Sequence, residues 1–257
     1  MIFENIVFGP IKSRRLGDSL GLNVLPTQRK LCNFNCVYCE CGWNPDSQDI
    51  PKDYLHSKEE IITQLEEGLK KFRDKNQNID SITFAGNGEP TIHPEFPEIV
   101  DEVIILRDKF YPNAKITVLS NSTRLVDDGV FNALKKIDNP ILKLDSANKE
   151  MFYRISKTNP NNVNFDKIIQ RLIEFGSRAI IQTLLIRGKH NGEIIDNTTK
   201  EEFEKWLEII KQIKPLYVML YPIDRVTPES KLEKLTKGEI QSFADILIEN
   251  GINAKAY

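Results

Sequence analysis

The stretch CNFNCVYCEC, residues 32 to 41, contains all four cysteines of this 257-residue chain. Cys32, Cys36 and Cys39 follow a C-x3-C-x2-C spacing, and Cys41 comes two residues later. Clustered cysteines of a protein in a reducing compartment hold metal more often than they form disulfides. Three sites are compatible with such a stretch: a closed zinc site, a disulfide, or an iron–sulfur cluster with one position left for a non-protein ligand.

The composition is ordinary for a globular protein, with 40% hydrophobic and 28% charged residues and a formal net charge of -2. A chain of this length buries about three quarters of its unfolded surface, so it needs no disulfide to fold. No apolar run approaches the ~20 residues of a membrane-spanning helix, and the first ten residues lack the pattern of a signal peptide. We therefore expect a cytoplasmic protein without a membrane partner. The absence of a broad basic field argues against DNA as a partner.

Short apolar runs alternate along the chain with amphipathic stretches of helix length. The runs are rich in Ile, Val and Leu, as in strands that are buried on both faces of a parallel sheet. The predicted strands are residues 20–25, 81–85, 115–119, 141–145, 179–186 and 216–221, and the predicted helices are residues 57–73, 95–110, 127–137, 163–176, 199–213 and 236–250. Strict alternation predicts an α/β fold with parallel strands and right-handed crossovers. It is either an open doubly wound sheet or a partial (β/α)6 TIM-type barrel.

Two of the predicted helices begin with a capping pattern, in which Ser57 and Thr236 are each followed three residues later by glutamate. No linker rich in Pro, Gly or Ser interrupts the alternation. We therefore expect a single domain over residues 1–257, with a core at about residues 20–222 and a C-terminal helix and short strand within residues 236–256.

Both architectures place their chemistry in the loops at the carboxyl ends of the strands. The cysteines lie in the longest of these loops, about 30 residues between the first predicted strand and the first predicted helix. A loop of that length usually has a function. The x3-x2 spacing suits a loop wrapped around a four-iron cube, whereas zinc knuckles usually pair two well separated CxxC hairpins. The tight Cys39-x-Cys41 step disfavours Cys41 as a fourth ligand. We expect a nearby non-ligand thiol there, with a hydrogen-atom donor or a ligand to another group as alternatives.

In this context the spacing, with an aromatic residue just before the third cysteine, resembles the radical S-adenosylmethionine superfamily. The resemblance covers about residues 20–222 and implies the partial (β/α)6 barrel. It also implies a [4Fe-4S] cluster on Cys32, Cys36 and Cys39 whose open iron binds S-adenosylmethionine. An electron from the cluster would cleave this cofactor or cosubstrate to methionine and a 5′-deoxyadenosyl radical, which abstracts hydrogen from a substrate. Tyr38 matches the family position that contacts the adenine.

The segment FAGNGEP, residues 84–90, follows the second predicted strand. Small residues let a backbone approach a ligand closely, and a carboxylate accepts hydrogen bonds from an ammonium group. The resemblance assigns Asn87, Gly88 and Glu89 to the position of the family's GGE motif, which holds the amino group of the methionine moiety. Ser120 and Asn121 end the third predicted strand, where the family has a Thr-Asn type of pair near the cofactor.

In KLDS, at the end of the fourth predicted strand, Lys143 stands where a ribose-binding serine is common in the family, and Asp145 ends the strand. An inward lysine among apolar neighbours needs a polar partner, such as a cofactor. The alternative is a lysine that faces a helix or solvent. Arg154 matches a position that often meets the cofactor carboxylate, with a surface role as its alternative.

Polar residues in the fifth and sixth predicted strands point to a substrate side. Gln182 and Thr183 interrupt an apolar run, and buried polar groups need partners, which the lumen of a barrel would supply. Tyr221, Asp224 and Arg225, in YPIDR at the end of the sixth predicted strand, could line the same lumen.

The segments SRRLG, residues 13–17, and FAGNGEPT, residues 84–91, resemble stand-alone iron–sulfur oxidoreductases related to wyosine-forming tRNA enzymes. Those enzymes carry a second cluster on cysteines upstream of the first strand, whereas residues 1–31 contain no cysteine, which argues against the same reaction. The resemblance implies an external one-electron reductant of the flavodoxin or ferredoxin type. A small molecule, a peptide and a modified nucleotide all stay open as substrates, and our hypothesis is a large or macromolecular substrate, or a partner that closes the mouth of the barrel. A non-catalytic electron carrier and a zinc-stabilised binding module are the alternative functions.

Overall fold

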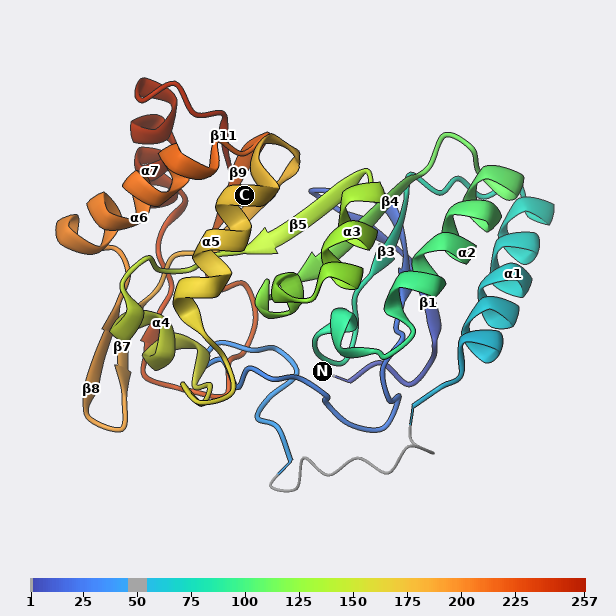
Figure 1. Cartoon of the computed structure of the whole chain (residues 1–257), viewed down its shortest axis with the longest axis horizontal. Helices are drawn as coiled ribbons and strands as arrows, with labels where there is room; N and C mark the ends of the chain where they lie inside the picture. The colour runs from blue at the N-terminus through green and yellow to red at the C-terminus, as the bar shows by residue number, and fades with distance from the viewer. Residues whose placement is uncertain (1, 46–54) are drawn as a thin grey trace. The chain divides into compact units, whose positions relative to one another are not determined.

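The structure is a computed structural model that describes residues 2–45 and 55–257. Its helices and strands divide into two compact units (Figure 1). The first unit holds Met1–Cys32, Asn44–Ser120 and Asp127–Pro140, and the second holds Asn33–Trp43, Asn121–Val126 and Ile141–Tyr257. Residues 46–54, which belong to the long loop predicted to contain the cysteines, lie outside the described residues. The single domain expected from the sequence stays a prediction.

The described part of the first unit contains three parallel strands and one antiparallel edge strand. The strands are β1 (Val7–Ser13), β2 (Gly17–Leu22), β3 (Ser81–Phe84) and β4 (Lys115–Ser120). β2, β3 and β4 pair in parallel, and β1 pairs antiparallel with β2. The sequence did not predict β1 because it is only half-buried and contains Pro10. Proline cannot donate to a ladder and is therefore confined to edge strands, which is where β1 lies.

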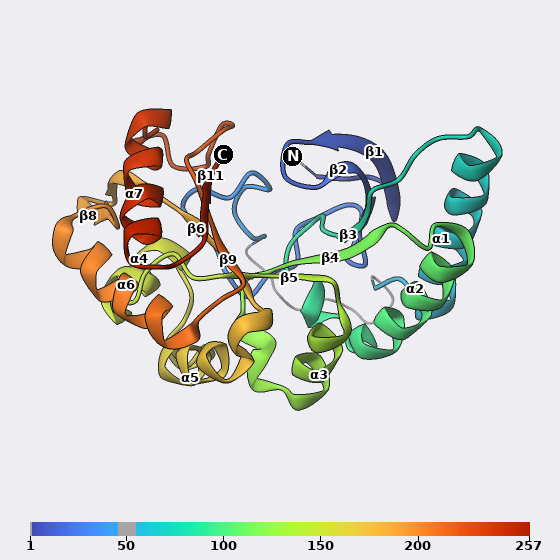
Figure 2. The same cartoon turned by 90° about the horizontal axis from the view of Figure 1, so that it is seen from above.

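The helices of the first unit are α1 (Lys58–Asp74), α2 (Phe96–Phe110) and α3 (Asp128–Lys136), with a short 3-10 helix η2 (Pro90–Ile92). α1 packs against α2 and α2 against α3, and Figure 2 shows α1 and α2 on the same side of β2 and β3. The predicted cap of α1 is confirmed, because the Ser57 side chain accepts a hydrogen bond from the Glu60 amide. The buried face of α1 consists of Ile61, Leu65 and Leu69, spaced one helical turn apart.

The second unit repeats the parallel pattern. Its strands follow the order β5 (Asn139–Lys143, whose first two residues belong to the first unit), β6 (Ile180–Leu184), β9 (Tyr217–Tyr221) and β11 (Ala254–Ala256). Its helices are α4 (Lys149–Ser156), α5 (Phe165–Phe175), α6 (Lys200–Ile213) and α7 (Lys237–Glu249), with 3-10 helices η3 (Thr123–Val126) and η4 (Gly176–Arg178). The described strands β5, β6, β9 and β11 all pair in parallel, as predicted.

A second, three-stranded antiparallel sheet was not predicted. It consists of β7 (Arg187–His190), β8 (Glu193–Asp196) and β10 (Leu232–Glu233). The sequences of β7 and β8 are too charged to read as strands, although the Asn191-Gly192 pair between them is a strong hairpin signal. None of the described helices is both long enough and apolar enough to span a bilayer.

Candidate functional site

The second unit contains the cysteine loop, defined here as residues 33–43, which lies along the end of α4. The amides of Asn35 and Val37 donate to the carbonyls of Ser156 (2.8 Å) and Ile155 (3.1 Å). These are the last carbonyls of α4, which have no partner within the helix. On the other side of the loop, the Glu229 amide donates to the Val37 carbonyl (3.3 Å). Backbone hydrogen bonds therefore fix the loop between α4 and the segment after β9.

Asn121 and Arg225 are predicted site residues whose side chains contact residues of the cysteine loop. The Asn121 Nδ2 donates to Asn33 Oδ1 (2.7 Å), and Asn33 Nδ2 donates to Thr123 Oγ1 (2.6 Å). Arg225 forms an exposed ion pair with Glu40 (2.8 Å), which lies between the last two cysteines. The structure thus brings Asn121 and Arg225 to opposite ends of the loop.

The cysteines differ in exposure: Cys36 is buried, while Cys32, Cys39 and Cys41 are half-buried, and none of these four described residues forms a disulfide. A turn in which the Cys39 amide donates to the Cys36 carbonyl (3.0 Å) links the second and third cysteines. Across the described residues, no group of three or more His, Cys, Asp and Glu side chains is placed so that it could hold a metal ion. Thiolates are the ligands of iron–sulfur clusters, so the donor chemistry of the four cysteines fits that group. The arrangement of the thiols around a cluster belongs to the proposal below.

Five predicted site residues form one hydrogen-bonded group, here called the strand-end cluster: Tyr38, Lys143, Asp145, Gln182 and Tyr221. The Tyr38 hydroxyl donates to Asp145 Oδ2, while Asp145 Oδ1 accepts from Lys143 Nζ (3.2 Å). The Tyr221 hydroxyl accepts from Lys143 Nζ (2.7 Å) and from Gln182 Nε2 (2.5 Å). Because Tyr38 belongs to the cysteine loop, the cluster connects that loop to the carboxyl ends of β5, β6 and β9.

The register of the parallel strands explains which residues join this cluster. Lys143 on β5 pairs with Gln182 on β6, so their side chains emerge side by side. Neighbouring residues of a strand point to opposite faces, and Thr183 accordingly lies on the other face. Its hydroxyl is buried and donates to the Leu144 carbonyl (2.7 Å). The structure therefore brings Gln182 into the cluster and keeps Thr183 out of it.

Burial and the interactions among its residues set the charges of the strand-end cluster. Burial alone lowers the pKa of Lys143, but Asp145, Tyr221 and Cys36 outweigh it, so the pKa lies above its ordinary value. Burial also raises the pKa of Tyr38, and the negative charges of Asp145 and Cys36 raise it further. At neutral pH, Lys143 is therefore an ammonium and Tyr38 a neutral phenol. The ammonium lies 4.9 Å from the centroid of the Tyr38 ring, within cation–π range.

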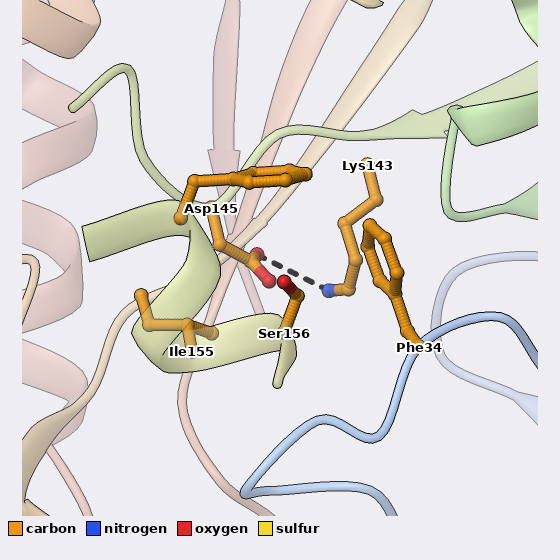
Figure 3. Close-up of a pocket in the computed structure, with 6 residues that line it drawn as sticks. Phe34, Lys143, Asp145, Ile155 and Ser156 are labelled. Atoms are coloured by element: carbon orange, nitrogen blue, oxygen red, sulfur yellow. Dashed lines mark hydrogen bonds and ion pairs between the residues drawn. The ribbon is translucent and has the colours of Figure 1, made fainter. Parts of the chain in front are cut away.

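A pocket opens beside this cluster (Figure 3). It is lined by Phe34, Lys143, Asp145, Phe152, Ile155 and Ser156. The Ser156 hydroxyl is buried and has no hydrogen-bond partner among the described residues. The sequence did not single out Ser156 or the two phenylalanines, although Phe34 lies between the first two cysteines. The pocket combines an ammonium, a carboxylate and a hydroxyl with apolar walls, so it suits an organic group that carries polar atoms.

Asn87, Gly88 and Glu89, here called the NGE motif, lie in the first unit next to Leu31, the residue that precedes Cys32. Gly88 forms an isolated parallel bridge with Leu31: the Leu31 amide donates to the Asn87 carbonyl (2.8 Å), and the Glu89 amide donates to the Leu31 carbonyl (3.1 Å). Gly88 has a φ of +137°, and a Cβ at this position would lie 1.8 Å from the Leu31 carbonyl oxygen. The glycine therefore lets the backbone before Cys32 approach the motif.

The side chains of Asn87 and Glu89 are both buried. The Asn87 side chain accepts from the Phe3 amide and donates to the carbonyls of Phe3 and Pro26, each at 2.8 Å. Glu89 accepts from the amide (3.1 Å) and the hydroxyl (2.5 Å) of Thr91 at the start of η2. Asn87 thus anchors the N-terminal segment. The cofactor contacts expected of this motif stay predictions.

The other predicted residues lie at three further places. Ser120 is buried at the end of β4 in the first unit. Arg154 on α4 pairs with Glu150 on the same helix. Asp224 lies 3.5 Å from Lys234 in an exposed ion pair after β9. Their predicted roles toward a cofactor or a substrate stay predictions.

Comparison of the sequence with known proteins identifies the family of this chain. The family model described as the radical SAM superfamily matches residues 30–200. A UPF0026 protein of Methanocaldococcus jannaschii is 31% identical over 260 residues, which span 96% of this chain and 74% of that protein. A protein named GTPase Obg from Brachyspira hyodysenteriae is 33% identical over 239 residues, but this chain spans only 32% of its length. A probable dual-specificity RNA methyltransferase RlmN of a Thermotoga species is 27% identical over 231 residues, which span 87% of this chain and 61% of that protein.

Solved structures with 25% identity or less show the likeness of the fold. A radical SAM methyltransferase from Sphaerobacter thermophilus superposes with a TM-score of 0.67 at 17% identity, covering 93% of this chain and 65% of that one. The structure of TYW1 with a lysine-pyruvate adduct bound gives a TM-score of 0.56 at 19% identity, covering 90% and 73%. The predicted α/β fold of the partial (β/α)6 barrel type is thereby confirmed. With the cysteine motif inside the matched residues, this chain belongs to the radical SAM superfamily of enzymes.

Proposed function

We propose that Cys32, Cys36 and Cys39 bind a [4Fe-4S] cluster and that the protein uses it to cleave S-adenosylmethionine reductively. When bound, the cluster supplies the electron that breaks a carbon–sulfur bond of S-adenosylmethionine and so gives the 5′-deoxyadenosyl radical. The observation that carries the proposal is the cysteine loop, which the Tyr38–Asp145 hydrogen bond joins to the ends of the parallel strands. Ligands of α/β barrels bind at these strand ends.

The residues of the chain bind and orient the reactants in this proposal, while the cofactors carry the chemistry. Phe34 and Phe152 give the pocket of Figure 3 apolar walls, and the hydroxyl of Ser156 offers a hydrogen-bonding group there. Contacts to S-adenosylmethionine are assigned to Tyr38, Asn87, Gly88, Glu89, Ser120, Asn121, Lys143, Asp145 and Arg154. An external one-electron reductant of the flavodoxin or ferredoxin type completes the system.

For the substrate we propose a nucleotide-bearing molecule. The support comes from relatives whose names refer to such substrates: the RNA methyltransferase RlmN of Thermotoga, and a nucleotide dehydratase of Flammeovirga pacifica that is 25% identical over 198 residues. Gln182, Tyr221 and Arg225 would line the substrate side. Addition of total RNA or of mononucleotides to the reduced protein should increase the release of 5′-deoxyadenosine. A peptide mixture should leave the release unchanged.

The proposal is tested by single alanine substitutions of the cysteines, followed by anaerobic reconstitution with iron and sulfide. Substitution of Cys32, Cys36 or Cys39 should abolish bound iron and sulfide, the EPR signal after dithionite reduction, and the release of 5′-deoxyadenosine. Cys41→Ala is the matched control within the same loop and should retain all three. Loss of the cluster in Cys41→Ala would mean that all four cysteines are ligands of the cluster. The protein would then be an electron carrier. Bound zinc without sulfide would identify a structural metal site.

A further inference from the structure

A half-buried ammonium lies beside the cysteine loop. The Lys143 side chain is 15% exposed and that of its partner Asp145 is 8% exposed. The Lys143 Nζ lies 4.9 Å from the centroid of the Tyr38 ring, and Tyr38 lies in the sequence between Cys36 and Cys39. A charge in such surroundings is costly unless it is compensated. Asp145 compensates this charge, so the ammonium can persist next to the proposed ligands.

Two direct contacts and two supporting hydrogen bonds hold the ammonium in place. Lys143 Nζ donates to Asp145 (3.2 Å) and to Tyr221 (2.7 Å), and the Tyr221 hydroxyl is fixed in turn by Gln182 (2.5 Å). The Asp145 carboxylate is itself oriented by the Leu184 amide (2.9 Å). Figure 3 shows the Lys143 and Asp145 side chains converging in the pocket. The position of the positive charge is thus determined by the fold.

We propose that Lys143 raises the reduction potential of a cluster bound at Cys36, by placing a fixed positive charge beside the loop that carries this ligand. Reduction adds one negative charge to a cluster, and a nearby cation stabilises that charge. The potentials of iron–sulfur clusters depend on net charge, on hydrogen bonds to the sulfurs and on exposure to solvent. The inference rests on the proposed function and names a role for Lys143 that its predicted contact with S-adenosylmethionine does not include.

The short distance between the Lys143 ammonium and the Tyr38 ring brings the positive charge close to the cysteine loop, where it can interact with negative charge on a cluster. Cys36 and Tyr38 are both buried, so solvent and salt screen this interaction weakly. The opposing Asp145 carboxylate is partly offset by hydrogen bonds from Tyr38 and from the Leu184 amide.

The test is a redox titration of the reconstituted protein, followed by EPR. At the midpoint potential of the wild type, Lys143→Met should show about a tenfold lower ratio of reduced to oxidised cluster, which corresponds to a shift of about 59 mV to more negative potential for one electron. Lys143→Arg keeps the charge and should stay near the wild type. The matched control is Lys205→Met, which removes an exposed lysine of α6 that pairs with Glu201. It should leave the potential unchanged.

A second uncharged variant distinguishes an effect of the lost charge from an effect of misfolding. Lys143→Gln removes the charge but keeps amide donors for Asp145 and Tyr221, and its iron content and urea midpoint report whether it folds. Wild-type potentials in both uncharged variants, or a shift in Lys143→Arg as large as in Lys143→Met, would overturn the inference and leave the proposed function intact. A wild-type protein that binds no cluster at all would overturn both.

Discussion

At the scale of single residues, His93 shows how hydrogen bonds fix one protonation state of a buried imidazole. Its Nδ1 accepts from the Glu95 amide (3.2 Å), and its Nε2 lies 3.0 Å from the His56 carbonyl, which can only accept. The neutral ring with its proton on Nε2 satisfies both partners. A second proton on Nδ1 would face the amide hydrogen of Glu95 and break that bond.

This arrangement predicts a loss of stability in mild acid. Burial is the main cause that lowers the pKa of His93 below its ordinary 6.5, although the His56 carbonyl opposes it. As the pH falls through the ordinary value, the unfolded chain therefore takes up the proton first, and the folded state loses stability until its own lower pKa is reached. Urea unfolding at pH 7.5 and pH 5.5 should show a smaller loss for His93→Gln than for the wild type. Equal losses in the two proteins would show that His93 contributes nothing to the acid sensitivity.

At the scale of elements, the bridge between Leu31 and Gly88 predicts that the glycine is required. Gly88→Ala would bring its Cβ 1.8 Å from the Leu31 carbonyl oxygen, at a φ of +137° that side chains rarely adopt. We expect this variant to lose more than about 1 kcal/mol in the free energy of unfolding, measured in urea.

The matched control is Gly238→Ala, in the first turn of α7, where an added Cβ meets no atom within 4 Å. Alanine favours a helix over glycine by up to about 1 kcal/mol, so this variant should be as stable as the wild type or more stable. If both alanine variants unfolded at the same urea concentration, the close approach of Leu31 to Gly88 would have no energetic importance.

The helices and strands that could be predicted from the sequence are those whose neighbouring residues carry a clear pattern of capping or hydrophobic periodicity. The capping box of Thr236 and Glu239 is present, because it depends only on residues three apart. α4 is eight residues long and was not among the predicted helices, since so short a stretch carries little periodicity. β7 and β8 were missed because their charged residues conceal a strand that pairs with its neighbour rather than with the parallel strands.

At the scale of the whole molecule, the sequence predicted the parallel α/β fold and all five residues of the strand-end cluster, but not the pocket beside it. Lys143, Asp145 and Tyr221 could be singled out because polar residues stand out in apolar strand sequences. Ser156 and Phe152 belong to a short helix whose packing against the cysteine loop leaves no local pattern. Contacts of this kind depend on the tertiary fold, and a single sequence does not contain them in readable form.

The whole-molecule consequence of the proposed function is a linkage between ligand binding and folding. S-adenosylmethionine that binds only the folded, cluster-loaded protein should stabilise it by about 2.7 kcal/mol at a concentration 100 times its dissociation constant. Chemical unfolding under anaerobic conditions should therefore show a higher urea midpoint with S-adenosylmethionine for the reconstituted wild type. After removal of iron by a chelator, and in Cys36→Ala, the same addition should leave the midpoint unchanged. An equal gain in the iron-free protein would mean that S-adenosylmethionine binds without the cluster, and the coordination vacancy on which the proposed reaction depends would lose its support.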